Sequence, residues 1–352
     1  MITSFDAYAL TQHSLFSIEI GRPSFITMTI LLVTPGAKVR HSGNRCTASQ
    51  WAEILRRQGH RVVVCYDVPE TLPSAEADVL IAMHAVKCAG VIAAYRTAFP
   101  SGKVLLALTG TDIYPEPSTV ALTSMRESDG LIVLQEKALE KIPLDCRDKA
   151  TVVIQSVRPL PIQTKPESEF FDVCVVGHLR EVKNPLLTAR ASRLVPAGSR
   201  LRVRQAGGIL ETVYAPLVAQ EERENPRYQW LGELSSDEVS DLLAESDLMV
   251  LTSHSEGGAR VIGESIVHGT PVLSTRIDGV IGLLGESYPG FFPDDDPDAL
   301  AAMLSKCETD SGFYFRLLEA SAALTCRFSP EAEARALGAA IAKLTENCHS
   351  EA

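Results

Sequence analysis

Two glutamates eight positions apart, Glu256 and Glu264, form the pair whose spacing in this sequence most suggests chemistry. The run between them contains two glycines and follows an apolar segment. We therefore expect Glu256 on a loop at the start of a helix, and Glu264 about two helical turns further on. Carboxylates placed in this way accept hydrogen bonds from sugar hydroxyls, and glycines let a ligand approach the backbone. Taken alone, however, two glutamates fit a capped helix with an incidental surface carboxylate better than a ligand site.

Basic side chains precede a second predicted helix. His178, Arg180 and Lys183 follow an apolar run that ends at Gly177, and the helix is expected to begin near Pro185. Cations beside the outward-pointing N–H groups of a helix start are suited to a phosphate. Solvated charges on a turn explain the stretch equally well when it is considered in isolation.

A third group of polar residues comprises Lys38, Arg40, Asn44 and Arg45, in a loop that leads into a helix expected to start near Thr47. The loop contains three cations and no carboxylate, although the chain as a whole carries a formal net charge of −11. Such a concentration of positive charge between a strand and a helix is suited to an anion. An ordinary solvated basic loop is the alternative.

Two further apolar runs end in residues able to bind a ligand by hydrogen bonds. His84 follows one run, and Thr109, Gly110 and Thr111 follow another. In an open parallel sheet the carboxyl ends of the strands lie at one edge, where ligands bind. A lone histidine beside a strand is nevertheless more often a structural residue than a catalytic one.

The elements that must position these residues are short apolar runs alternating with stretches of helical periodicity. The runs predict strands in the first half at residues 30–33, 61–65, 79–83, 104–108, 131–134 and 152–154. They predict strands in the second half at residues 171–176, 200–204, 227–231, 248–251 and 271–274. Each half is therefore expected to be an α/β unit with a mainly parallel, doubly wound sheet. Two Rossmann-like domains that face an interdomain cleft form the GT-B architecture, which serves several chemistries.

Length and composition exclude several classes of protein. The 352 residues are enough for two domains, and the net charge of −11 argues against a nucleic-acid partner. No apolar run approaches the roughly 20 residues needed to cross a bilayer, and the first residues lack the features of a signal peptide. We therefore expect a cytoplasmic protein without a membrane or nucleic-acid partner, which holds any anionic ligand through a local cluster of cations.

The stretch from Glu256 to Glu264, together with residues 269–272 and 278–280, resembles the E-x7-E signature and downstream loop of family 4 glycosyltransferases. The resemblance covers nearly all of the second domain. It implies that Glu256 faces the donor sugar and that Glu264 binds the ribose hydroxyls of a nucleotide sugar. It also implies that backbone N–H groups approach the sugar at Gly257, Gly258 and Ala259.

The same resemblance assigns the basic stretch to the donor diphosphate. Lys183 stands where the family has a lysine, and Gly177 stands where it has a glycine followed closely by an arginine. His178 departs from that pattern, which makes Arg180 the expected replacement. Arg260 is a second departure, since the family commonly has an apolar residue or proline there. We expect Arg260 either to form a structural ion pair or to reach a phosphate of the donor or of an anionic acceptor.

A longer set of short stretches, from about Leu31 to the end, looks like the selenosugar synthases of selenoneine biosynthesis. The matching stretches are residues 43–45, 47–48, 51–52, 59–62, 108–114, 134–135, 155–156 and 177–183. This resemblance implies UDP-N-acetylglucosamine or a related UDP-sugar as donor, selenophosphate as acceptor, and a 1-selenosugar with a new carbon–selenium bond as product. It implies catalytic roles for His84, Arg180, Lys183 and Glu256. The acceptor residues would be Lys38, Arg40, Asn44, Arg45, His84, Thr109, Gly110 and Thr111.

Neither a metal nor another cofactor is expected. The run Asp294–Asp296 superficially resembles a metal-binding D-x-D motif, but Pro297 follows it at a predicted helix start, which favours an N-terminal cap. Cations and helix dipoles can stabilise the departing UDP without a metal.

The resulting domain scheme divides the chain into five segments. Residues 1–28 are predicted to be an extension, either disordered or a mis-assigned start, and residues 29–156 the acceptor-binding domain. Residues 157–170 form a proline-rich linker, residues 171–330 the nucleotide-sugar-binding domain, and residues 331–352 a C-terminal helix that packs back on the first domain. Two other functions stay open: a family 4 enzyme with an ordinary sugar or small alcohol acceptor, and a non-catalytic nucleotide-sugar-binding protein. A GT-B epimerase is disfavoured by the E-x7-E context.

Overall fold

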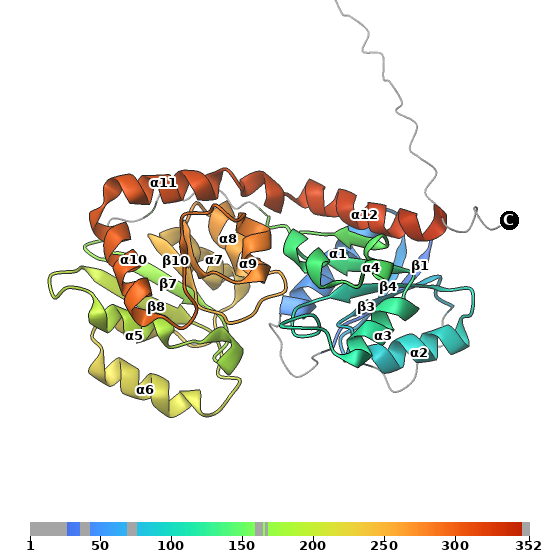
Figure 1. Cartoon of the computed structure of the whole chain (residues 1–352), viewed down its shortest axis with the longest axis horizontal. Helices are drawn as coiled ribbons and strands as arrows, with labels where there is room; N and C mark the ends of the chain where they lie inside the picture. Colours follow the sequence, from blue (N-terminus) through green and yellow to red (C-terminus); the bar gives the residue numbers. More distant parts are fainter. Residues whose placement is uncertain (1–26, 36–42, 69–75, 159–164, 166–167, 347–352) are drawn as a thin grey trace, which may run out of the picture.

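The computed structural model describes residues 27–35, 43–68, 76–158, 165 and 168–346, which form two parallel six-stranded sheets flanked by helices (Figure 1). The first sheet has the strand order β2-β1-β3-β4-β5-β6 and the second β12-β11-β10-β7-β8-β9. The strands of the first sheet are β1 (Thr29–Val33), β2 (Arg61–Cys65), β3 (Val79–Met83), β4 (Lys103–Leu108), β5 (Gly130–Val133) and β6 (Ala150–Val152). Those of the second are β7 (Phe171–Val176), β8 (Leu201–Ala206), β9 (Tyr228–Trp230), β10 (Leu248–Leu251), β11 (Val272–Thr275) and β12 (Phe291–Phe292).

Helices connect the strands in both halves. In the first half they are α1 (Gly43–Arg57), α2 (Ala89–Ala98), α3 (Thr119–Glu127), η1 (Glu136–Lys141) and α4 (Leu144–Arg147). In the second half they are η2 (Glu181–Lys183), α5 (Leu187–Leu194), α6 (Tyr214–Glu224), α7 (Ser236–Glu245), α8 (Arg260–Val267), α9 (Asp278–Leu284), α10 (Pro297–Thr309) and α11 (Ser311–Ala322). The chain then continues through η3 (Thr325–Phe328) and α12 (Pro330–Glu346). The predicted α/β class with two Rossmann-like halves is confirmed.

Burial on both faces of the sheets explains why the strands were visible as unbroken apolar runs. All residues of β3, β5 and β10 are buried, with none of the alternation that a half-exposed strand shows. Parallel sheets covered by helices on both faces require such sequences. Two separate apolar cores lie on the two faces of the first sheet, one of them built around Trp51 and Leu55 of α1.

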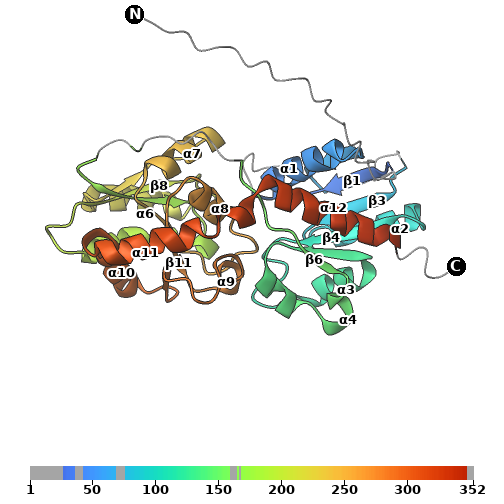
Figure 2. The same ribbon diagram turned by 90° about the horizontal axis from the view of Figure 1, so that it is seen from above.

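The last helix crosses from the second half to the first (Figures 1 and 2). Apolar side chains of α12 recur at helical spacing and complete the core that contains Trp51. They are Leu337, Ala340, Ile341 and Leu344. The other crossing lies beside this one, because the N–H of Val157 donates to the carbonyl of Phe328 at 3.0 Å. The two passages of the chain between the halves are therefore hydrogen-bonded to each other.

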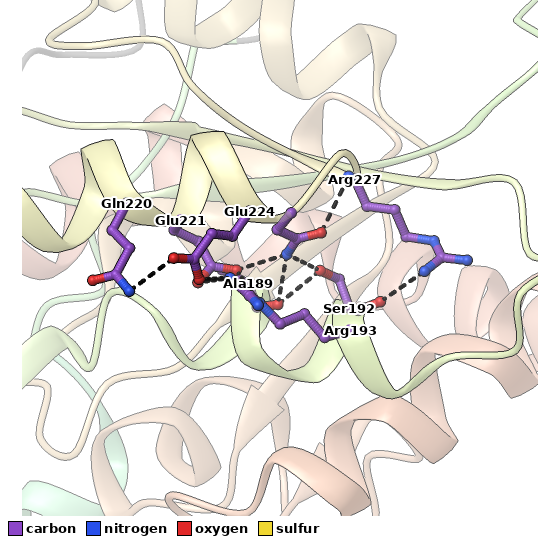
Figure 3. A network of polar contacts seen from close by, with 8 residues as sticks. Ala189, Ser192, Arg193, Gln220, Glu221, Glu224 and Arg227 are labelled. Carbon is purple, nitrogen blue, oxygen red and sulfur yellow. Dashed lines mark hydrogen bonds and ion pairs between the residues drawn. The ribbon is translucent and has the colours of Figure 1, made fainter.

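A buried polar network joins α5 to α6 in the second half (Figure 3). Arg193 donates to both carboxylate oxygens of Glu221, at 2.8 and 2.9 Å. The amide nitrogen of Asn225 donates to Glu221 at 2.7 Å, to Ser192 Oγ at 2.9 Å and to the carbonyl of Ala189 at 3.1 Å. Burial alone would raise the pKa of Glu221, but the hydrogen bonds from Arg193 and Asn225 outweigh it and lower that pKa.

Several predicted boundaries were wrong. Helix α1 begins at Gly43 and not near Thr47, so Asn44 and Arg45 lie on its first turn rather than in a loop. Helix α5 begins at Leu187 and not near Pro185, because η2 ends in a left-handed residue, Asn184, with a φ of 42°. The elements α9 and β12, and the 3-10 helix η1, were not predicted.

Candidate functional site

The carboxyl ends of β7 and β10 form the switch point of the second sheet, since the chain runs from β7 to β8 on one side and returns to β10 on the other. A pocket lies there, and its lining includes Gly177, Lys183, Gln205, Thr252 and Ser253. Ligands of open parallel sheets bind at this position. The pocket is therefore the candidate ligand site of the second half.

Lys183 and Glu256 meet at this pocket. Lys183 Nζ lies 2.5 Å from Glu256 Oε1, and Ser253 Oγ donates to the same oxygen at 2.5 Å. The lysine side chain is 21% exposed and the glutamate side chain 10%. Each charge is thus largely withdrawn from water, and pairing offsets part of the desolvation cost. The structure brings together the two residues on which the sequence prediction of a donor site chiefly rested.

Backbone contacts fix the two loops that carry this pair. Thr252 Oγ1 donates to the carbonyls of Lys183 at 2.9 Å and of Asn184 at 3.0 Å. The N–H of His254 donates to the carbonyl of Val182 at 2.9 Å. The loop after β10 is therefore hydrogen-bonded directly to η2, which holds the backbone segments of Lys183 and Glu256 beside each other.

The glycines after Glu256 lie against loops of the first half. A Cβ atom on Gly257 would lie 2.2 Å from the carbonyl oxygen of Thr109, and one on Gly258 would lie 2.6 Å from Leu134 Cβ. A Cβ atom on Gly110, whose φ is +138°, would likewise lie 3.0 Å from the backbone nitrogen of Gly257. The sequence suggested that these positions are glycine so that a ligand can approach the backbone. The structure adds a second reason, because the two halves are in close contact here.

Asp112 organises the facing loops of the first half. Its carboxylate is 2% exposed and accepts hydrogen bonds from the N–H groups of Ala85, Thr109 and Gly110, at 2.8, 3.0 and 2.8 Å. A buried carboxylate satisfied in this way holds the ends of β3 and β4 together. Its acceptor atoms are used by the backbone, so Asp112 acts as a structural residue.

His84 follows β3 with a φ of 105°, a conformation that side-chain-bearing residues rarely adopt and that clusters at functional sites. Its Nδ1 accepts from the N–H groups of Val86 and Lys87, both at 3.3 Å, so the proton must be on Nε2, which lies 3.1 Å from Thr111 Oγ1. Burial is the main cause that lowers the pKa of His84, while the nearby charge of Asp112 opposes the shift. His84 is therefore a neutral donor through Nε2.

Asn44 connects the start of α1 to the same region, since its Nδ2 lies 3.5 Å from Thr109 Oγ1. Arg45 instead lies over the ring of Tyr66, with its guanidinium carbon 4.5 Å from the ring centroid. The structure thus gathers Asn44, His84 and the Thr109–Thr111 turn opposite the loop that follows Glu256. Two further predicted acceptor residues, Lys38 and Arg40, lie outside the described residues.

The other predicted diphosphate residues lie differently. His178 Nδ1 accepts from the N–H of Gly208 at 3.1 Å, which gives it a structural contact. The buried Nε of Arg180 has no hydrogen-bond partner within the described ranges. Arg260 forms an ion pair, as one of the two sequence interpretations held, with its Nε 2.8 Å from Glu264 Oε1.

The acidic run has three separate partners. Asp294 lies 2.8 Å from His254 Nδ1, Asp295 pairs with Arg190 at 2.9 Å, and Asp296 caps α10 as predicted. Over the stretches of chain that the structure describes, no group of three or more His, Cys, Asp or Glu side chains is placed to hold a metal ion. Every helix in those stretches is too short or too polar to span a bilayer.

The second half, which carries the switch-point pocket, matches a known family. Residues 160–323 match the family model described as "Glycosyl transferases group 1". No curated protein matches the chain in sequence.

Solved structures share the fold of the whole chain. A glycosyltransferase from Rickettsia africae aligns with a TM-score of 0.71 at 16% identity, over 91% of this chain and 100% of that one. Sucrose-phosphate synthase from Thermosynechococcus elongatus aligns with a TM-score of 0.73 at 16% identity, with the same shares. Anabaena HepE, solved with UDP-glucose, aligns with a TM-score of 0.69 at 15% identity, over 92% of this chain and 100% of its own. The predicted GT-B fold is confirmed.

Three site residues escaped the sequence analysis. Ser253 bonds to Glu256, Gln50 of α1 bonds to Arg260, and the buried Glu333 of α12 bonds to Gln50. The Ser-x-x-Glu spacing of Ser253 and Glu256 was a usable signal. Gln50 and Glu333 gave none, because Gln50 is 210 positions from Arg260 and 283 positions from Glu333 in the sequence.

Proposed function

We propose that the protein transfers a sugar, N-acetylglucosamine in the first instance, from a UDP-sugar to selenophosphate, giving a 1-selenosugar in selenoneine biosynthesis. The observation that carries the donor part is the Lys183–Glu256 pair at the switch point of a group 1 glycosyltransferase domain. Selenophosphate as the acceptor is supported by the resemblance to selenosugar synthases. It is also supported by the backbone N–H groups that already occupy Nδ1 of His84 and the carboxylate of Asp112.

Donor binding would redistribute the charges of the pocket. Lys183 can leave Glu256 for the diphosphate, which frees the Glu256 carboxylate to accept hydrogen bonds from the sugar hydroxyls. Glu264, on α8, would bind the ribose. The same fold in HepE is known with UDP and with UDP-glucose, which supports a uridine nucleotide as the donor's leaving group.

The state of the facing loops favours an acceptor that is already an anion. An alcohol acceptor loses a proton during transfer, and a general base assists that step. The single basic nitrogen of neutral His84 accepts two backbone N–H groups, and the Asp112 carboxylate accepts three. Selenophosphate carries its own nucleophilic selenium and needs no such base.

In the proposed step, selenium attacks the anomeric carbon of the donor sugar. The carbon–selenium bond forms while the bond from that carbon to the UDP oxygen breaks, and UDP leaves with the electron pair. Water then cleaves the selenium–phosphorus bond, which gives the selenosugar and inorganic phosphate. The protein's contribution would be to position two anions and to stabilise the departing UDP through Lys183.

The test is anaerobic incubation of the protein with UDP-N-acetylglucosamine and selenophosphate, followed by mass spectrometry for a selenosugar and for UDP. A selenium-bearing product supports the proposal. Glycosylation of an added sugar or alcohol without any selenium product would favour an ordinary family 4 enzyme instead. UDP binding without turnover of any acceptor would favour a non-catalytic binding protein.

Two variants separate the donor and acceptor roles. Lys183→Met should weaken UDP binding by roughly 10- to 100-fold, the range of a lost hydrogen bond to a charged group. Lys306→Met, which removes an exposed lysine of α10 that does not line the pocket, is the matched control. A Lys38→Ala, Arg40→Ala double variant should lose acceptor use and keep UDP binding; equal loss of both would remove that loop from the acceptor site.

A further inference from the structure

A buried carboxylate on the last helix ties three segments of the first half together. Glu333 is 1% exposed and accepts from Trp51 Nε1 at 2.9 Å, from Ser156 N at 3.1 Å and from Ser156 Oγ at 2.6 Å. It also accepts from Gln50 Nε2. These donors satisfy the carboxylate without a cation, and none of the described residues forms an ion pair with it. Glu333 therefore joins α1, the end of the first half and α12 at one point.

This network fixes the orientation of the Gln50 side chain. Its nitrogen faces Glu333, the carbonyl of Ser156 at 3.1 Å and Ser156 Oγ at 2.9 Å. A carboxylate and a carbonyl only accept, so that end of the amide must be the NH₂ group. The Gln50 oxygen consequently points the other way, where Arg260 Nη1 donates to it at 2.8 Å.

Arg260 therefore bonds to both halves of the molecule at once. Its Nε donates to Glu264 on the same helix, and its Nη1 donates to Gln50 across the boundary between the halves. The fork of a guanidinium can hold two acceptors in fixed directions, which a lysine cannot do. The Arg260 and Glu264 side chains are only 24% and 25% exposed, so water competes weakly for these bonds.

We propose that Arg260 is a positioning residue that links the orientation of Glu264, the carboxylate assigned to the donor ribose, to closure of the two halves. Gln50 is the hydrogen-bond acceptor of Arg260 on the first half. The inference rests on the proposed nucleotide-sugar site for the role of Glu264. Removal of the Gln50 amide would break this bond and let the two halves separate. Removal of the Arg260 guanidinium would let them separate and would also leave the Glu264 side chain without the partner that orients it.

The surroundings of α8 fit this role. A Cβ on Gly263 of α8 would lie 2.6 Å from Phe328 Cδ1, so the helix packs directly on η3, beside one passage of the chain between the halves. The carbonyl of Phe328 accepts from Val157 of the other passage. Helix α8 thus packs beside both connections, and its first residue bonds to Gln50.

Closure can be measured without substrate. Gln50→Leu and Arg260→Met each remove one partner of the Gln50–Arg260 hydrogen bond. Gln50→Leu also takes a donor from Glu333, whereas Arg260→Met also takes a donor from Glu264. We expect both variants to enlarge the radius of gyration in small-angle X-ray scattering and to speed amide exchange at Gly110. Circular dichroism would verify that each is folded.

Gln58→Leu is the matched control. Gln58 directly follows α1, the helix that carries Gln50, and its side chain donates to the carbonyl of Ala334 on α12 at 2.8 Å, a bond that stays within the first half. We expect its scattering and exchange to equal those of the wild type. Wild-type compactness in both Gln50→Leu and Arg260→Met, or equal expansion in Gln58→Leu, would overturn the coupling.

UDP titration calorimetry distinguishes the two roles of Arg260. Gln50→Leu should bind UDP within about twofold of the wild type, whereas Arg260→Met should bind roughly tenfold more weakly because Glu264 loses a charged partner. Equal weakening in both variants would contradict the positioning role. If the wild type binds no UDP, the proposed function fails, and the scattering result alone still decides whether the Gln50–Arg260 bond holds the halves together.

Discussion

Replacement of Gly257 by alanine tests whether the glycine loop serves contact between the halves. The new Cβ would lie 2.2 Å from the Thr109 carbonyl oxygen, closer than the 3.0 Å below which real Cβ contacts are essentially never found. The obstructing atoms belong to the backbone of Thr109 and Gly110, so no side-chain rotation relieves the overlap. The two halves can relieve it by separating, and the cost therefore falls on the closed arrangement. Overpacking costs about 1–3 kcal/mol, equivalent to roughly a 5- to 150-fold loss of the closed population.

The assay compares UDP release from UDP-N-acetylglucosamine and selenophosphate with UDP affinity. Alanine retains the backbone N–H, so we expect turnover by Gly257→Ala to fall by that factor while the UDP dissociation constant stays close to the wild-type value. Gly90→Ala is the control, since a Cβ there meets nothing within 4 Å. Wild-type turnover by Gly257→Ala, or a loss of UDP affinity as large as the loss of turnover, would refute the reasoning.

Three further outcomes follow from the contacts described above. Asn225→Ala should lower the free energy of unfolding by about 1–3 kcal/mol in urea titrations, because it removes one donor from Glu221 and one from the buried Ala189 carbonyl of α5. The pKa of Glu221 in the folded protein lies below its ordinary value of 4.5, so its ionised form stabilises the fold. The free energy of unfolding of the wild type should therefore exceed that of Glu221→Gln by its full amount above pH 4.5, and this excess should vanish as the pH falls through the folded pKa. A constant difference across that range would contradict the shift. His84 should give the NMR signature of a neutral, Nε2-protonated ring at pH 6.5, since its pKa is lowered; an imidazolium spectrum at that pH would count against the assigned tautomer.

The fold could be predicted well from sequence because the sheets are buried on both faces. Runs such as Val79–Met83 contain no polar residue, and the turn residues around them mark their ends. Short elements were lost: β12 has two residues, and α9 is a fully buried apolar helix with only its first residue charged. Neither shows a periodicity that a window of sequence can detect.

The site could be predicted only where the residues follow each other closely in the chain. Glu256 and Glu264 lie within one strand–loop–helix unit, so the preceding apolar run, the glycines and the spacing predicted that Glu256 lies on the loop and Glu264 on the helix. The contact of Arg260 with Gln50 could not be predicted, since Gln50 is 210 positions away and its side-chain oxygen faces Arg260 only because Glu333 and Ser156 hold the amide nitrogen. The tautomer of His84 likewise depends on the N–H groups of Val86 and Lys87, which follow a residue with an unusual φ and gave no signal in the sequence.

The return of α12 to the first half also has a consequence for synthesis on the ribosome. The core around Trp51 and Leu55 is completed by Leu337, Ala340, Ile341 and Leu344, which are made only after the whole second half. The nascent first half must therefore wait, with an apolar face uncovered, until the entire second half has emerged. A truncation at the linker would leave that face permanently exposed, so the N-terminal unit is unsuited to separate expression.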